Sequence, residues 1–126
     1  MRKLVVIMAI AIASSTFNTV KAQEVKTIKL EQTPGEFTVK GFNLTEGTYT
    51  FEVKNNGVDH PVGFGLATVS QPDVDHALAV ITNGGRGLND GESDATDPIT
   101  LKPGKYVYWC PANPTEQYEL NVSKKD

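Results

Sequence analysis

The side chains best suited to chemistry in this chain are its single cysteine and one of its two histidines. His60 lies in the segment KNNGVDHP, and Cys110 opens the segment CPANPTEQYELNV. A thiolate and an imidazole together are ligands that copper accepts in both of its oxidation states. If both residues lie at one end of a rigid β-structure, they supply the minimal parts of a mononuclear copper site.

Each residue also has a plain structural interpretation. A lone cysteine cannot close an internal disulfide, so Cys110 is a buried small apolar residue, half of an intermolecular bridge, or a metal ligand. His60 is otherwise a loop histidine hydrogen-bonded to backbone. Sequence spacing alone leaves open whether the two side chains meet.

The elements that would position these residues are short strands. Turn residues recur at short intervals, which is typical of an all-β sandwich. Between the turns, runs with two-residue alternation predict about seven strands in two packed sheets. These runs are 24–32, 36–43, 48–54, 61–69, 99–101, 105–110 and 117–123.

Alternation also predicts which side chains face the core. In the run 105–110 both faces are apolar, so the pattern leaves the inner face open; if Cys110 faces inward, Trp109 faces outward. In the runs 48–54 and 117–123 one face is apolar, and it carries Tyr49, Phe51 and Val53, and Tyr118, Leu120 and Val122.

Residues 72–81 break the β pattern and predict a short helix. Apolar residues recur there at helical spacing, Ser70 is suited to cap the first turn, and glycines follow the end. On this helix His76 points away from the buried face, as a solvated residue. The following segment 83–98 is polar and glycine-rich; its acidic residues do not match the helix-loop-helix calcium motif, so we expect a solvated loop.

The first 22 residues have the pattern of a secretory signal peptide. Arg2 and Lys3 precede the apolar residues 4–13, and Ala22 offers a small residue for cleavage. This apolar run is too short to span a bilayer. We therefore expect residues 23–126 to form one domain, a monomer exported to the periplasm or secreted, with no membrane insertion after cleavage.

Charge and composition narrow the classes of partner. Loss of Arg2, Lys3 and Lys21 would leave 9 of the 12 basic residues against 15 acidic ones, a net charge of −6. This disfavours nucleic acid and would steer a basic partner protein. No phosphate loop, and no acid beside a nucleophile, is present in the sequence, so we expect a protein that is not an enzyme.

Two segments resemble the cupredoxin family of small blue copper proteins, over nearly all of residues 23–126. The segment LEQTPGEFTVKGFNLTEGTYTFEVKNNGVDHPVGF is similar to the cupredoxin strands that lead to the first copper-ligand histidine, which would be His60. LKPGKYVYWCP is similar to the family strand that ends in the ligand cysteine, which would be Cys110. The resemblance implies a cupredoxin-like Greek-key β-sandwich with one short helix.

The last loop departs from the family pattern. Amicyanin-like loops read Cys-x-x-His-x-x-Met, whereas here Asn113 stands at the histidine position and Glu116 at the methionine position. A Glu116 carboxylate would complete a ligand set with His60 and Cys110, with Asn113 or water in the fourth place. Its negative charge would lower the reduction potential of bound copper.

Two functions therefore stay open. One is an exported copper-binding, electron-transfer protein with an altered ligand set, in which Trp109 beside the ligand cysteine either serves as the electron exit or packs on the sheet. The other is a copper-free cupredoxin fold used as an interaction or accessory module. Copper storage is disfavoured, because both methionines, Met1 and Met8, lie in the leader.

Overall fold

The computed structural model describes residues 24–113 and 115–125, so the predicted leader lies outside the described residues. Ten strands and one turn of 3-10 helix follow one another along this part of the chain. In chain order they are β1 (Val25–Thr33), β2 (Glu36–Phe37), β3 (Phe42–Thr45), β4 (Gly47–Asn55), β5 (Phe64–Thr68), η2 (Val74–His76), β6 (Ala79–Ile81), β7 (Ser93–Ala95), β8 (Ile99–Leu101), β9 (Gly104–Trp109) and β10 (Tyr118–Ser123).

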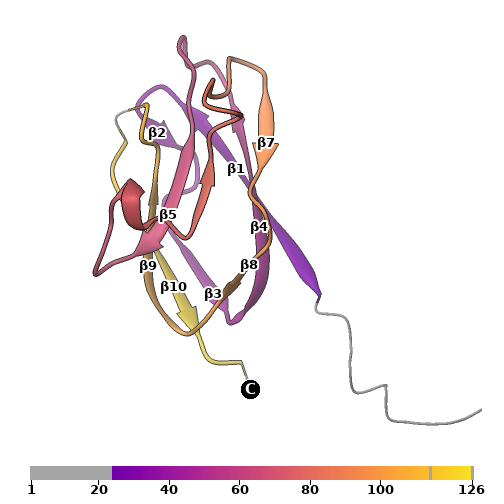
Figure 1. Ribbon diagram of the computed structural model, residues 1–126, viewed down its shortest axis with the longest axis vertical. Coiled ribbons are helices and arrows are strands. Elements are labelled where there is room, and N and C mark those ends of the chain that lie inside the picture. Colours follow the sequence, from indigo (N-terminus) through magenta and orange to yellow (C-terminus); the bar gives the residue numbers. More distant parts are fainter. Residues whose placement is uncertain (1–23, 114, 126) are drawn as a thin grey trace, which may run out of the picture.

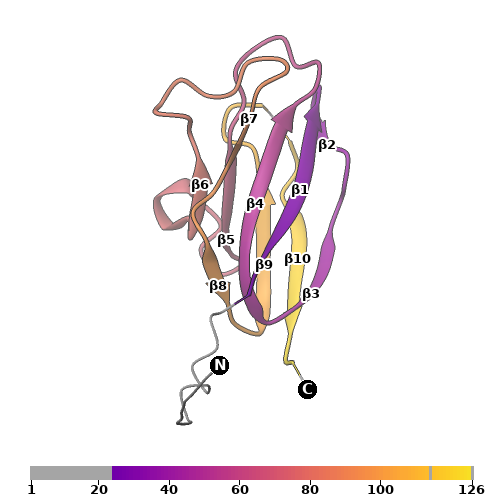
Figure 2. The same cartoon turned by 90° about the vertical axis from the view of Figure 1, so that its right-hand side faces the viewer.

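The strands form two sheets that face each other as separate layers (Figures 1 and 2). One sheet has the order β2-β1-β4-β7, with β8 also paired to β4, and the other has the order β3-β10-β9-β5-β6. β1 runs parallel to β4 and β10 runs parallel to β3, whereas the other paired strands are antiparallel. The predicted all-β sandwich is thereby confirmed.

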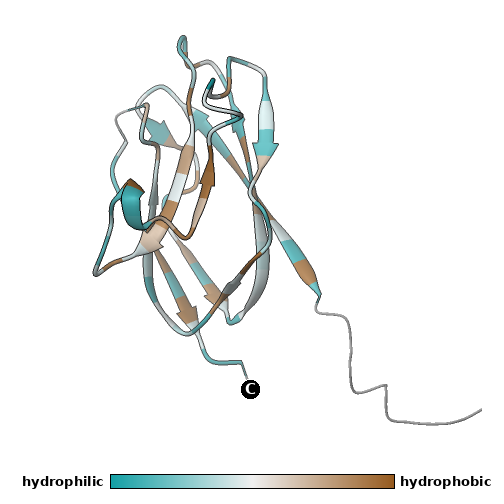
Figure 3. Cartoon of the chain, in the orientation of Figure 1, coloured by the Kyte–Doolittle hydropathy of each residue, from teal (hydrophilic) through white to brown (hydrophobic). Residues whose placement is uncertain are grey.

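The predicted core positions on β4 and β10 are buried, which confirms the alternation. Figure 3 shows polar and apolar bands following one another along several strands. At the centre, the Phe37 ring packs edge-on against the rings of Phe64, Tyr108 and Tyr118, with centroids 5.4 to 6.2 Å apart. Edge-to-face pairs of this kind add to the energy of burial, so the two-residue strand β2 is anchored by one phenylalanine.

Strand β9 is buried on both faces. Tyr108 and Cys110 belong to the main core, while Trp109 joins Ala67 and Val107 in a small separate cluster. The Trp109 ring lies over Gly65, where an added Cβ would be 3.2 Å from the indole Cζ2 atom. Trp109 is only 9% exposed, so the indole packs on its sheet.

The prediction of a helix over 72–81 was wrong in extent. The helical part is the single turn η2, capped by Asp73 rather than Ser70, and the chain then enters β6, which pairs with β5. Val74 and Leu78 are about half exposed, so the predicted apolar helix face is not buried. The β-branched residues Val80 and Ile81 favour a strand, and pairing with β5 decides the outcome. His76 is exposed, as predicted, and its Nδ1 lies 2.7 Å from Asp73 Oδ1.

The polar loop after β6 contains one strand that the sequence did not predict. β7 pairs with β4 through residues 93–95. Acidic side chains of the loop accept backbone N–H groups: Asp90 from Gly57 at 2.8 Å, and Glu92 from Asn89 at 2.8 Å. Among the described residues, no helix is long and apolar enough to cross a membrane.

We expect Tyr108 to make the protein less stable as the pH rises from about 10 to about 12. Burial raises the pKa of Tyr108 to about 12, whereas an unfolded chain releases a phenolic proton near pH 10. The folded state therefore holds a proton that the unfolded state loses, and stability falls across this window. Urea unfolding at a series of pH values measures the slope. Tyr108→Phe should flatten it, and an unchanged slope in that variant would contradict the assignment.

Candidate functional site

The predicted chemistry-bearing residues lie at the end of the sandwich drawn uppermost in Figure 1, where three connecting segments meet. These are the turn between β1 and β2, the segment 56–63 between β4 and β5, and the segment 110–117 between β9 and β10. Hydrogen bonds join the segment 110–117 to the turn between β1 and β2 and to the segment 56–63. The structure thus brings the His60 and Cys110 segments to one end of the sandwich, which is the condition that a shared site requires.

Cys110 follows β9 and is only 4% exposed. Its Sγ atom accepts three backbone N–H groups, from Asn113 at 3.0 Å, Gly63 at 3.3 Å and Ala112 at 3.4 Å. Its own N–H donates to Thr115 Oγ1 at 3.0 Å. The sulfur is therefore enclosed by donors from its own loop and from the segment before β5.

Asn113 is 2% exposed, and its side-chain amide turns toward the end of β1. Its Nδ2 donates to Gln32 Oε1 at 3.2 Å and to the Thr33 carbonyl oxygen at 3.3 Å. The Gly35 N–H donates to its Oδ1 at 3.4 Å. Both ends of the amide are thus used to hold the β9–β10 loop against the β1–β2 turn.

Gln32 closes this network into a ring. It is fully buried, and its Nε2 donates to the Gly63 carbonyl oxygen at 2.5 Å. Gly63 then donates to Cys110 Sγ, Asn113 donates to the same sulfur, and the Asn113 amide returns to Gln32. We call these four residues, Gln32, Gly63, Cys110 and Asn113, the Cys110 ring.

A second buried amide, Asn55, supports the segment that carries His60. The Val58 N–H donates to Asn55 Oδ1 at 2.9 Å, and Asn55 Nδ2 lies 3.2 Å from the His60 carbonyl oxygen and 2.9 Å from that of Leu88. Buried polar groups of this kind are stable only when they are hydrogen-bonded. Asn55 therefore fixes the backbone at His60 rather than its imidazole.

The other predicted ligands face solvent. The His60 side chain is exposed, and its Nδ1 lies 3.1 Å from the carbonyl oxygen of Pro61. Glu116 is exposed as well. Among the described residues, no three of His, Cys, Asp and Glu gather closely enough to hold a metal ion. In this arrangement the Asn113 amide is directed to Gln32 and Thr33, so it is not available as a fourth ligand beside Cys110.

Sequence reasoning missed Gln32 and Asn55, although a signal was present. Each stands two residues after an inward-facing apolar residue, Leu30 in β1 and Val53 in β4. Continued alternation places both amides inside. A polar side chain at an inward position near the end of a strand indicates a buried hydrogen-bond network.

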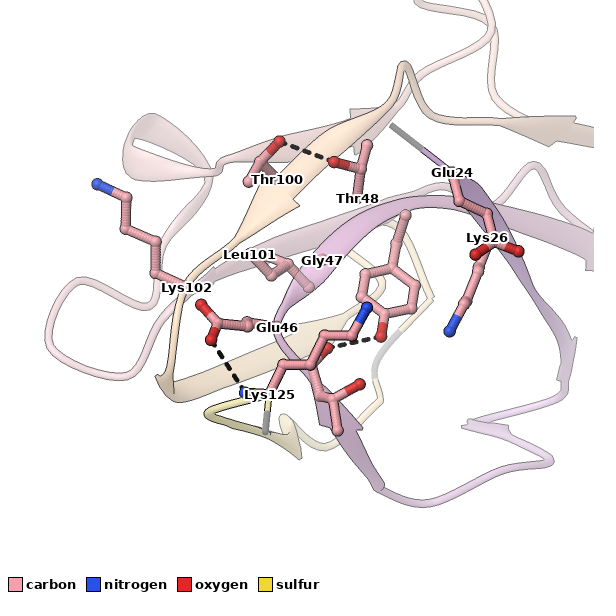
Figure 4. A pocket seen from close by; sticks show the side chains of 11 residues that line it. Glu24, Lys26, Glu46, Gly47, Thr48, Thr100, Leu101, Lys102 and Lys125 are labelled. Carbon is pink, nitrogen blue, oxygen red and sulfur yellow. Dashed lines mark hydrogen bonds between the residues drawn. The ribbon is translucent and has the colours of Figure 1, made fainter. Parts of the chain in front are cut away.

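A polar hollow of about 300 Å³ lies at the opposite end of the strands (Figure 4). The backbone N–H of Lys125 donates to Glu46 Oε2 at 2.9 Å, and the Tyr49 hydroxyl donates to the Thr45 carbonyl oxygen at 2.6 Å. In Figure 4 the ammonium groups of Lys26 and Lys102 extend to opposite sides. These two charged groups therefore do not converge on a single position where a ligand could bind.

Comparison with solved structures places this arrangement among known folds. Auracyanin B aligns with 82% of this chain and 91% of its own, at 19% identity and a TM-score of 0.61. Auracyanin A of Chloroflexus aurantiacus, described as a "blue" copper protein, aligns with 79% of this chain and 100% of its own, at 18% identity and a TM-score of 0.60. Azurin from Methylomonas sp. strain J aligns with 80% of this chain and 98% of its own, at 12% identity and a TM-score of 0.52.

The chain therefore has a cupredoxin-like fold, as its sequence predicts. No protein-family model and no curated protein matches it. At these identities the likeness establishes the fold, while the site must be judged from the residues of this chain.

Proposed function

We propose that this small cupredoxin-type protein is exported and acts as an interaction or accessory module, with the Cys110 end closed by hydrogen bonds rather than by a metal. The observation that carries the proposal is the side chain of Asn113, whose amide is committed to Gln32, Thr33 and Gly35. Through these hydrogen bonds Asn113 holds the β9–β10 loop against the β1–β2 turn, which is a structural role.

The free energy that it would cost to break the Asn113 hydrogen bonds supports a metal-free Cys110 end. Turning Asn113 toward an ion beside Cys110 would leave Gln32 and the Thr33 carbonyl without this partner in a buried region. Each buried polar group left unsatisfied costs about 1–3 kcal/mol. The hydrogen-bonded arrangement therefore opposes metal entry.

We infer export and a protein partner from the sequence of the chain. The apolar run at 4–13 is typical of a leader for secretion. A single, deeply buried cysteine is protected in an oxidising compartment, because it has little access to other thiols. The net charge of −6 expected after cleavage favours a partner with a basic surface, and the proposed role is non-catalytic.

We expect purified protein to show no thiolate-to-copper absorption band when Cu(II) is added. We also expect no rise in melting temperature with Cu(II) or Zn(II). A metal that bound the folded state would raise the melting temperature. Visible spectra and thermal melts measure both. Cys110→Ser, His60→Ala and Glu116→Gln provide the comparison and should show the same lack of response to added metal.

An intense visible band lost in Cys110→Ser and His60→Ala would contradict the proposal. That result would instead support a copper carrier that uses His60 and Cys110 as ligands. In that case Trp109, next to the cysteine on β9, would become the candidate route for electrons to a basic redox partner. Loss of the band in Glu116→Gln would further assign the carboxylate as a ligand.

A further inference from the structure

A mainly apolar hollow of about 300 Å³ lies beside the Cys110 ring. Its lining includes Pro61, Ile81 and Pro111, together with Gly63 and Ala112. The last two residues both donate their backbone N–H groups to Cys110 Sγ. The hollow therefore shares a wall with the ring and lies at the same end of the sandwich.

The remaining wall is the glycine-rich loop after β6, and hydrogen bonds fix its shape. The N–H groups of Gly85 and Gly87 both donate to the Thr82 carbonyl oxygen, at 2.9 and 2.8 Å, and Asn83 Nδ2 donates to the Gly87 carbonyl oxygen at 2.8 Å. Gly87 has a φ of +75°, and an added Cβ there would lie 2.7 Å from the Cβ atom of Pro61. Only glycine allows this conformation and this close approach.

This fixed loop carries one charged side chain at the hollow, that of Arg86. Arg86 is exposed and lines the hollow, and it is the only arginine among the described residues. The ion pairs within the described residues join Lys40 to Glu36 and His76 to Asp73. No carboxylate of the described chain therefore neutralises the guanidinium of Arg86, although the protein is acidic overall.

We propose that this hollow binds a small organic carboxylate with a short apolar body. A guanidinium pairs with a carboxylate through two parallel hydrogen bonds, which makes arginine the residue suited to this group. Small-molecule sites are mostly apolar hollows with a few polar groups that fix orientation. Here Arg86 holds the carboxylate, and the walls formed by Pro61, Ile81 and Pro111 cover the body. The inference rests on the proposed function and names a ligand class for its closed end.

Isothermal titration calorimetry of purified protein tests the proposal with hexanoate as the probe. Hexanamide has the same apolar body without the charge, and acetate has the charge without the body. We expect hexanoate to bind at least about tenfold more tightly than either, because both contacts are needed. Equal binding of hexanamide would overturn the proposal, as would the absence of measurable hexanoate binding.

Two substitutions, with one control, test the guanidinium contact and the apolar contact separately. Arg86→Gln should weaken hexanoate binding at least about tenfold, whereas the matched variant Lys102→Gln, at the polar hollow, should leave it unchanged. Ala112→Phe should block the hollow; Ala112 is exposed, and a thermal melt checks that this variant folds. Unchanged affinity in Arg86→Gln, or equal loss in Lys102→Gln, would overturn the assignment. The copper titration is a separate readout, so failure of the closed end and failure of carboxylate binding are distinguished.

Discussion

Replacing Gln32 with leucine is expected to lower the free energy of unfolding by about 2–6 kcal/mol, because two buried partners lose their hydrogen bonds at about 1–3 kcal/mol each. Leucine is close to glutamine in size, so packing changes little. The partners left behind are the Gly63 carbonyl oxygen and the Asn113 amide. Chemical denaturation measures the loss.

The matched control is Gln71→Leu, the same change at an exposed loop position, which should alter stability by no more than about 0.5 kcal/mol. Asn113→Ala should also destabilise, and the double variant should lose less than the sum of the two, since both act on one bond. Additive losses, or a Gln32→Leu variant as stable as the unchanged protein, would show that the ring does not act as a unit.

The fold was predictable because it depends on local patterns. Two-residue alternation on β4 and β10 identified the buried sets, and the turn residues marked most strand limits. The secondary structure of short segments was harder to predict, because tertiary pairing determines it. The side chains of residues 79–81 are compatible with a helix or a strand, and pairing with β5 makes this segment the strand β6.

The site was predictable only in part, for a physical reason. The sequence identified the His60 and Cys110 segments as candidates, but their placement at one end of the sandwich came from the structure. The Cys110 ring did not follow, because three of its four bonds join residues 31, 47 and 81 positions apart. No local sequence pattern shows which polar groups at one end of a sandwich will form hydrogen bonds with each other. A polar residue at an inward position, as at Gln32, is the signal that sequence analysis can use.

Changing Gly63 to alanine should speed the reaction of Cys110 with a thiol reagent by about tenfold or more. An added Cβ at Gly63 would lie 2.8 Å from the Ile81 carbonyl oxygen, so the segment before β5 must shift. The shift would weaken both ring bonds of Gly63, to Cys110 Sγ and from Gln32 Nε2. A buried thiol reacts through local opening, and each 1.4 kcal/mol by which opening becomes easier raises the open population about tenfold.

The control for this variant is Gly47→Ala, the same change at the start of β4. There the nearest atom to an added Cβ is 3.7 Å away, which is an ordinary contact, and the position is remote from the Cys110 ring. Its labelling rate should stay within about twofold of the unchanged protein. If Gly63→Ala reacts no faster than Gly47→Ala, then Gly63 does not guard the sulfur. A fast reaction already in the unchanged protein would show that the ring is open in solution, because enclosure by three N–H donors and 4% exposure both predict slow labelling.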